Sequence, residues 1–294
     1  MTALSYVAVC LIWGSTWLAI KIGLDGVPPF LGAGLRFVVA VAVAVTAVVL
    51  VLRRQPIRLT RDDRICIVSQ GILVFWFNYA AVYWAEMRIS SGLTAVIFST
   101  MPLTTAMLSR FWTRNEVMGG RKLAGIAVGM IGTLLLFWPD DRLGASQMPG
   151  MLGALFASTC SSIALVIVKR HGAKSDPFVL NLFSMGLGAV CLLGMSALFE
   201  RSAPVAWSAG NVGALVYLAV CGSVVTFSLY YWLIKRLDAT VVSLSTLITP
   251  IIALILGRAF LDEVITPLAF AGIATILAGV AVAIAPARRA RMNG

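Results

Sequence analysis

The feature that most constrains this chain is a series of long apolar runs separated by short charged segments. Ten runs are close to the ~20 residues that a helix needs to cross the hydrocarbon core of a bilayer. They cover residues 4–22, 29–52, 65–87, 91–111, 122–138, 149–168, 177–199, 212–234, 241–260 and 267–285. The sequence therefore predicts an all-α integral membrane protein with ten transmembrane helices.

The same runs exclude other fold classes. Of the 294 residues, 60% are hydrophobic and 12% are charged, whereas a soluble domain has about 25% charged residues. This surplus of apolar side chains excludes a soluble enzyme and a secreted disulfide scaffold. A transmembrane β-barrel needs apolar and polar residues in alternation, but residues 38–45 are only valine and alanine. Helices are therefore the expected membrane spans.

The distribution of positive charge predicts how the spans are oriented. The net charge is +11, which in a soluble protein would indicate nucleic-acid binding. With the N-terminus placed in the cytoplasm, every connection on that side carries at least two Lys or Arg residues. Every connection on the opposite side carries or adjoins one. This is the positive-inside pattern, so both termini are expected in the cytoplasm and no nucleic-acid partner is needed.

The sequence also repeats itself at a spacing of 147 or 148 residues. The Ala-Gly-Ile-Ala of residues 124–127 recurs at 271–274, and Tyr83-Trp84 recurs as Tyr231-Trp232. Such self-similarity indicates a duplication. The predicted domains are residues 1–148 and 149–294. Because each holds an odd number of spans, five, the second is inverted in the membrane, as in secondary transporters that bind substrate between inverted repeats.

These residues resemble a known family. The early Trp-Gly-Ser-Thr-Trp of residues 13–17, the helices with Pro102 and Pro250, and the acidic Glu116 and Glu263 after them resemble the EamA-type half repeats of the drug/metabolite transporter superfamily. The pattern across the chain is similar to the bacterial aromatic amino acid exporter branch, which also handles cationic toxins such as methyl viologen. The resemblance implies a ten-helix carrier of the bacterial inner membrane. It also implies a central cavity lined by the first, third and fourth helices of each half.

Aromatic and hydrogen-bonding side chains within these spans are the candidate substrate-binding residues. A polar side chain inside a membrane is costly without a partner, which favours a place at a cavity or between helices. Packing between helices is the alternative for the serines, and a place at the membrane interface is the alternative for Tyr83. The candidates are Trp13, Thr16, Trp17, Asn78, Tyr79, Tyr83, Phe98, Met101, Ser161, Phe227, Tyr230, Ser245 and Thr246.

Charged and metal-binding residues are scarce within the spans. Every acidic residue falls in a connection or at a helix end, so no buried carboxylate is expected, although Glu86 remains a candidate proton site. Arg36 is expected to reach the outer interface with its head group, with attraction of a substrate carboxylate as the alternative. His171 is expected to be a solvated loop residue. No Cys or His spacing indicates a disulfide or a metal site, so neither a metal nor a cofactor is expected.

Together these features predict a secondary carrier, not an enzyme. It would export amino acids, aromatic or other large neutral ones, and related metabolites by alternating access. Facilitated diffusion is favoured because no coupling carboxylate is expected within the spans. The alternatives are a proton-coupled exporter of drugs or cationic toxins, an intramembrane enzyme and a non-transporting receptor. The expected partners are a small molecule and lipids. The glycine-rich helices that contain Gly125 and Gly272 would pack either within a monomer or across a homodimer.

Overall fold

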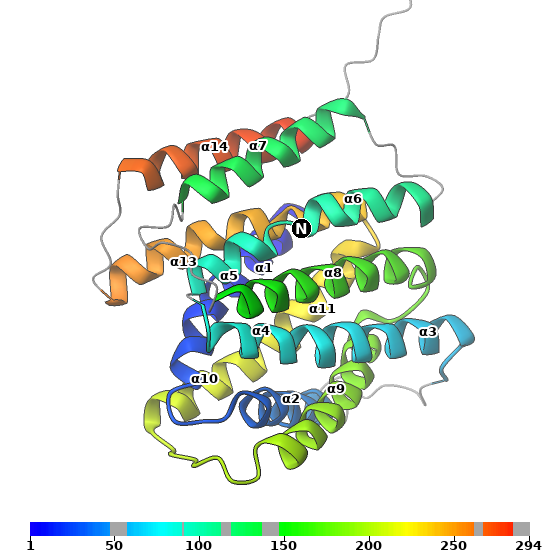
Figure 1. Ribbon diagram of the computed structural model, residues 1–294. Coiled ribbons are helices and arrows are strands. Elements are labelled where there is room, and N and C mark those ends of the chain that lie inside the picture. Colours follow the sequence, from blue (N-terminus) through cyan, green and yellow to red (C-terminus); the bar gives the residue numbers. More distant parts are fainter. Residues whose placement is uncertain (48–57, 90, 113–118, 137–146, 262–266, 285–294) are drawn as a thin grey trace, which may run out of the picture.

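The computed structural model describes residues 1–47, 58–89, 91–112, 119–136, 147–261 and 267–284, which form helices joined by short connections (Figure 1). No β-strand occurs within these ranges. The first part of the chain contains α1 (Thr2–Gly23), α2 (Pro29–Thr46), α3 (Arg61–Ser69), η2 (Gln70–Asn78), α4 (Tyr79–Glu86), α5 (Ser91–Phe98), α6 (Met101–Trp112) and α7 (Gly120–Leu136). The second part contains α8 (Met148–His171), α9 (Pro177–Phe199), α10 (Ala209–Ala219), η4 (Val220–Val225), α11 (Thr226–Ile234), α12 (Ala239–Ser243), α13 (Ser245–Leu261) and α14 (Pro267–Ile284). The predicted all-helical class is confirmed.

Seven described helical stretches are long and apolar enough to cross a membrane. They are Thr2–Gly23, Pro29–Thr46, Arg61–Glu86, Met148–His171, Pro177–Phe199, Ala209–Ile234 and Ala239–Phe260, and Phe270–Ile284 is a shorter apolar helix. Their outer surface is apolar too, since Val190 and Phe260 are 71% and 73% exposed. Such side chains are suited to contact with lipid, so the chain is a multi-pass membrane protein.

The predicted span at residues 91–111 differs from a single helix. It is divided into α5 and α6 by a turn at Ser99 and Thr100. The division is caused by Pro102, which lies in the first turn of α6 and has no N–H group to donate to the preceding turn.

Two local structures occur twice, at equivalent positions of the sequence repeat. The π-helical segment η4 lies 148 residues after residues 72–77 of the π-helical segment η2. In the first half, the Arg88 guanidinium lies 3.8 Å from the centre of the Trp84 ring and donates to the Trp84 carbonyl at 3.1 Å. Arg236 and Trp232 reproduce these contacts at 3.7 and 3.1 Å. Repeated sequence is thus accompanied by repeated local structure.

The glycine-rich helices α7 and α14 lie side by side within one chain (Figure 1). A Cβ atom added to Gly125 would lie 2.6 Å from the carbonyl oxygen of Gly279. A Cβ atom added to Gly132 would lie 2.8 Å from the carbonyl oxygen of Gly272. Only glycine permits backbones to approach this closely. Of the two arrangements expected for these helices, the structure has the packing within a single chain.

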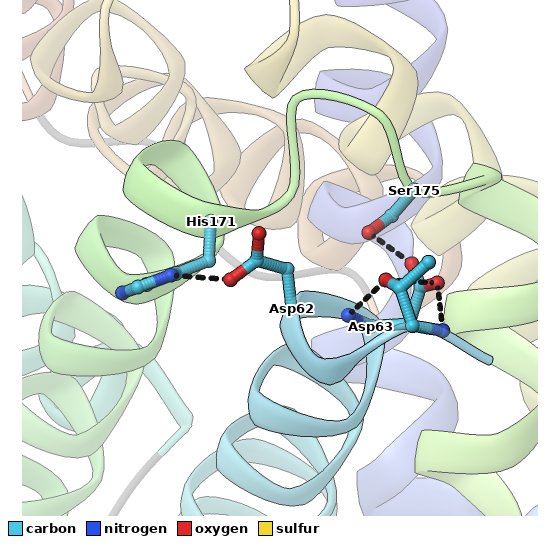
Figure 2. Close-up of polar contacts among 5 residues, drawn as sticks. Asp62, Asp63, His171 and Ser175 are labelled. Atoms are coloured by element: carbon cyan, nitrogen blue, oxygen red, sulfur yellow. Dashed lines mark hydrogen bonds and ion pairs between the residues drawn. The ribbon is translucent and has the colours of Figure 1, made fainter.

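A polar cluster joins the start of α3 to the end of α8 (Figure 2). Thr60 and Asp63 form a reciprocal cap on α3, and the Ser175 hydroxyl donates to Asp63 Oδ1 at 2.5 Å. Asp62 Oδ1 lies 3.0 Å from His171 Nδ1. His171 is the last residue of α8, so its predicted place in a loop is wrong. The helix continues beyond the apolar run through Lys169 and Arg170, and basic side chains are favourable in the last turn of a helix. The cluster connects residues from both repeats at one end of the bundle.

The contribution of the Thr60 cap to the stability of the protein should be measurable. Thr60→Ala removes the hydroxyl that accepts from the Asp63 N–H at 3.2 Å. The loss of an N-cap costs about 1 kcal/mol, which is expected to lower the apparent Tm in detergent by roughly 2–4 °C. Thr60→Ser, which keeps the hydroxyl, is the matched control. Equal melting temperatures for the two variants would show that the cap does not stabilise the protein.

Candidate functional site

One cavity lies between helices that come from both sequence repeats. About 770 Å³ of space lies between its wall atoms when the open mouth is included. Residues of α1, η2, α4, α5, α6, α8, α11, α12 and α13 form its wall. The lining residues are Trp13, Thr16, Trp17, Ile20, Gln70, Val74, Asn78, Tyr79, Val82, Phe98, Met101, Ser161, Phe227, Tyr230, Ser243, Ser245, Thr246 and Thr249.

The structure brings together all but one of the residues predicted to bind substrate. Tyr83 is the exception, because it is absent from the wall of this cavity and lines a second, smaller pocket beside Arg36. Its alternative place at the membrane interface is wrong, since the residue is 3% exposed. Helices α2, α5 and α8 pack around α4 and cover this part of it.

Three polar lining residues were not among the candidates: Gln70, Ser243 and Thr249. Gln70 is 1% exposed, and its Oε1 accepts from the Tyr231 hydroxyl at 3.1 Å. A side-chain amide in an apolar span was a usable signal, the same signal that identified Asn78. The apolar lining residues Ile20, Val74 and Val82 gave no such signal, because nothing distinguishes them from residues of the apolar core.

Aromatic rings form one part of the wall. The Trp13 ring lies 4.9 Å from the Tyr230 ring and 5.3 Å from the Phe227 ring, measured between centroids. Trp17 meets Phe98 edge-on at 5.9 Å. These separations are those of favourable aromatic pairs. The cavity therefore offers fixed, flat apolar surfaces to a ligand.

Two buried amides give the cavity its polar character. Asn78 Nδ2 donates to Ser161 Oγ at 2.9 Å, while Asn78 Oδ1 has no hydrogen-bond partner. Gln70 Nε2 also has none. In contrast, the hydroxyls of Thr16 and Thr246 each donate to the backbone carbonyl three residues earlier in the chain. Since an unsatisfied buried polar group costs free energy, one amide acceptor and one amide donor of the wall lack a partner that a ligand could supply.

The lining residues carry no formal charge. The buried carboxylate nearest to this region in the sequence is Glu86, the last residue of α4, which is 1% exposed and does not line the cavity. The prediction that no carboxylate is buried is therefore wrong at Glu86. The helices packed around α4 shield its last turn from water.

Arg36 is also buried, with 1% of its side chain exposed, so its predicted place at the interface is wrong. Its Nε donates to Ser223 Oγ at 2.9 Å, and its Nη2 donates to the Gly222 carbonyl at 3.2 Å. Both acceptors belong to η4, which packs against α2. The neighbouring segment η4 thus supplies hydrogen bonds that the head group would otherwise have to find at the interface.

The fold itself is shared with a solved structure. A crystal structure of a protein that is 22% identical in sequence superposes with a TM-score of 0.78, over 96% of this chain and 97% of that chain. This likeness concerns the fold alone.

Sequence relatives cover nearly the whole chain. An "uncharacterized transporter YoaV" of Bacillus subtilis is 29% identical over 90% of this chain and 89% of its own length. A "probable amino-acid metabolite efflux pump" of Escherichia coli is 27% identical over 92% of this chain and 90% of its own. Protein PagO of Salmonella typhimurium is 25% identical over 84% and 81%. Two of these three relatives are thus named as transport proteins.

The sequence pattern of the EamA-like transporter family matches twice, over residues 1–138 and again over residues 148–285. The two matches contain every helix that lines the cavity. This agrees with the resemblance seen in the sequence, and the chain belongs to the EamA-like transporter family.

Proposed function

We propose that this protein is a secondary carrier that exports amino acids with aromatic or other large neutral side chains. The observation that carries the proposal is the uncharged cavity, in which aromatic rings surround two incompletely bonded amides. Rings such as those of Trp13 and Trp17 would contact the apolar part of the substrate. Asn78 Oδ1 would accept a hydrogen bond from its ammonium group. The name of the Escherichia coli relative supports an amino-acid substrate.

The proposed mechanism is alternating access between two inverted five-helix repeats, residues 1–148 and 149–294. Contacts between equivalent positions support this symmetry. The Ser99 hydroxyl donates at 3.2 Å to the carbonyl of Thr246, the residue before its counterpart Leu247. Segments meet their own counterparts in this way when both lie near a twofold axis. The reciprocal glycine contacts of α7 and α14 are consistent with the same axis.

The proposed location is the inner membrane of a bacterium, with both termini in the cytoplasm. The positive residues of the connections support this orientation. In this orientation the cluster of Asp62, Asp63, His171 and Ser175 lies at the cytoplasmic end. Contacts that join the two repeats at one end would have to separate when the cavity opens there. Opening toward the cytoplasm would therefore break the contacts from α3 to His171 and Ser175.

Counterflow in proteoliposomes tests the proposed substrate. Vesicles loaded with unlabelled L-phenylalanine are expected to accumulate labelled L-phenylalanine transiently, while empty vesicles without protein do not. Labelled methyl viologen serves as the competing cationic substrate. Counterflow of methyl viologen without any amino-acid flux would identify a cation exporter instead, and flux of neither would contradict a carrier of these classes.

Transport is expected to be independent of a proton gradient, which is a second prediction. Glu86 is buried, but it does not line the cavity, so a proton bound there would not compete with substrate for the same groups. Imposed pH gradients should therefore not drive L-phenylalanine uphill, and Glu86→Gln should keep the wild-type flux. Accumulation that needs a pH gradient and disappears in Glu86→Gln would establish proton coupling through Glu86.

A further inference from the structure

A buried positive charge lies directly behind the wall of the cavity. The guanidinium of Arg36 touches the cavity wall through Tyr79, whose hydroxyl accepts from Nη2 at 3.2 Å. The guanidinium carbon lies 4.7 Å from the centre of the Tyr79 ring and 5.4 Å from that of Phe37. Since Tyr79 lines the cavity, a single aromatic side chain separates the charge from the proposed substrate.

Among the described residues, no carboxylate bonds to Arg36. Its hydrogen-bond partners there are the hydroxyls of Ser223 and Tyr79 and the Gly222 carbonyl, and the Tyr83 hydroxyl lies beside the guanidinium. Charged groups inside a membrane are costly, and they are retained where they have a function or a partner. An arginine that is hydrogen-bonded but not ion-paired therefore keeps a positive charge that a bound anion would balance.

One nitrogen of the guanidinium remains available to such an anion. Nη1 of Arg36 is buried and has no hydrogen-bond partner. Arg36 lines the second pocket, which is much narrower than the main cavity. Tyr83 lines the same pocket and lies close to the guanidinium. Apolar residues such as Val27 and Leu218 complete the wall, and none of the lining residues is acidic.

The chemistry of this pocket matches a carboxylate. A guanidinium presents N–H groups in a planar fork that fits the two oxygens of a carboxylate. The Tyr83 hydroxyl is a further donor. The excess positive charge in low-dielectric surroundings attracts an anionic group and repels a cationic one. A dication would be disfavoured next to Arg36.

We propose that Arg36 binds the carboxylate of the transported molecule when Tyr79, which separates the guanidinium from the main cavity in this structure, changes rotamer. The inference rests on the proposed function, because it assumes that a small metabolite occupies the cavity. It narrows the substrate class to molecules with a free carboxylate and excludes amides, amines and cationic toxins. A small inorganic anion, such as chloride, is the other source of negative charge that the same group would bind.

Competition against labelled L-phenylalanine tests the proposal on the wild-type protein in proteoliposomes. The competitors are phenylalanine, 3-phenylpropionate, phenylalaninamide and phenethylamine, which share the ring and differ in the charged groups. The two carboxylates are expected to inhibit flux at concentrations at least tenfold below those of the amide and the amine. Equal inhibition by all four would overturn the proposal. So would a flux that requires chloride and shows no preference for carboxylates.

Variants of Arg36 test whether this residue causes the preference for carboxylates. Arg36→Gln is expected to lower the ratio of phenylalanine flux to phenylalaninamide flux at least tenfold, and Arg36→Lys to lower it less. Arg88→Gln, which removes an exposed arginine of the same helix bundle, should leave the ratio unchanged. A purely structural role of Arg36 would reduce both fluxes together and keep the ratio, which contradicts the proposal. If Arg36→Gln does not fold, the wild-type competition series decides.

Failure of this proposal is distinguishable from failure of the proposed function. Wild-type protein that transports no amino acid at all contradicts the carrier function. Wild-type protein that transports L-phenylalanine and phenylalaninamide equally well retains the carrier function and contradicts the role of Arg36.

Discussion

Replacement of Gly279 with leucine is expected to prevent recovery of folded, monodisperse protein. A Cβ atom at this position would lie 2.6 Å from the carbonyl oxygen of Gly125 and would also collide with the backbone of Gly129. Side chains can change rotamer to relieve overpacking, which usually costs about 1–3 kcal/mol. Backbone atoms of α7 cannot move without separation of the two helices, so the cost should exceed this range.

The measurement is the yield of the monodisperse peak in size-exclusion chromatography after extraction in detergent. Gly194→Leu is the matched control, because a Cβ atom at Gly194 meets nothing within 4 Å. Both variants add the same side chain to a glycine of an apolar helix. A Gly279→Leu protein that elutes and melts like Gly194→Leu would show that the close contact of α7 and α14 does not hold the fold together.

Replacement of Trp17 with alanine should reduce L-phenylalanine flux at least tenfold. Trp17 lines the cavity and forms an edge-on pair with Phe98. An aromatic pair contributes about 0.5–1.5 kcal/mol beyond its buried area. Loss of the ring also removes apolar protein surface that the substrate would contact. Asn78→Ala is expected to have a similar effect, because it removes the acceptor proposed for the ammonium group.

Trp84→Ala is the control for these variants. Trp84 is stacked with Arg88 and does not line the cavity, so its loss should leave flux near the wild-type value. The variants are compared by initial rates of counterflow at equal protein content, after size-exclusion chromatography has shown equal folding. Trp17→Ala and Asn78→Ala proteins that both transport like Trp84→Ala would contradict the assignment of the cavity as the substrate site.

The sequence predicted most of the cavity because its residues conflict with a lipid environment. Asn78 and Ser161 are polar groups in apolar spans, and the structure joins them by a hydrogen bond within the cavity wall. Aromatic residues at helical spacing, such as Trp13 and Trp17, indicated one face of a helix. Whether these residues bind substrate remains a prediction until transport is measured.

The sequence predictions were wrong where tertiary contacts determine the burial of a side chain. Arg36 and Glu86 were expected near water because each lies toward the end of a helix, but neighbouring helices cover both. Their burial depends on partners distant in the sequence, as in the contact of Arg36 with Ser223. The π-helical segments were not predicted either, since apolar side chains are compatible with both kinds of helix. Helical spacing alone therefore could not separate the surroundings of Tyr79 from those of Tyr83.

Tyr79 and Phe227 occupy equivalent positions, 148 residues apart, and their ring centres lie 6.4 Å from each other in the wall of the cavity. If an ancestral chain formed this wall from two identical subunits, both sides would have carried the same side chain and would have treated both ends of a ligand alike. After fusion into one gene, each side was free to diverge. The Tyr79 hydroxyl, which is bonded to Arg36, has no equivalent on Phe227, so the two sides of the wall differ. We therefore expect a ligand with a polar head and an apolar tail to bind in one preferred orientation.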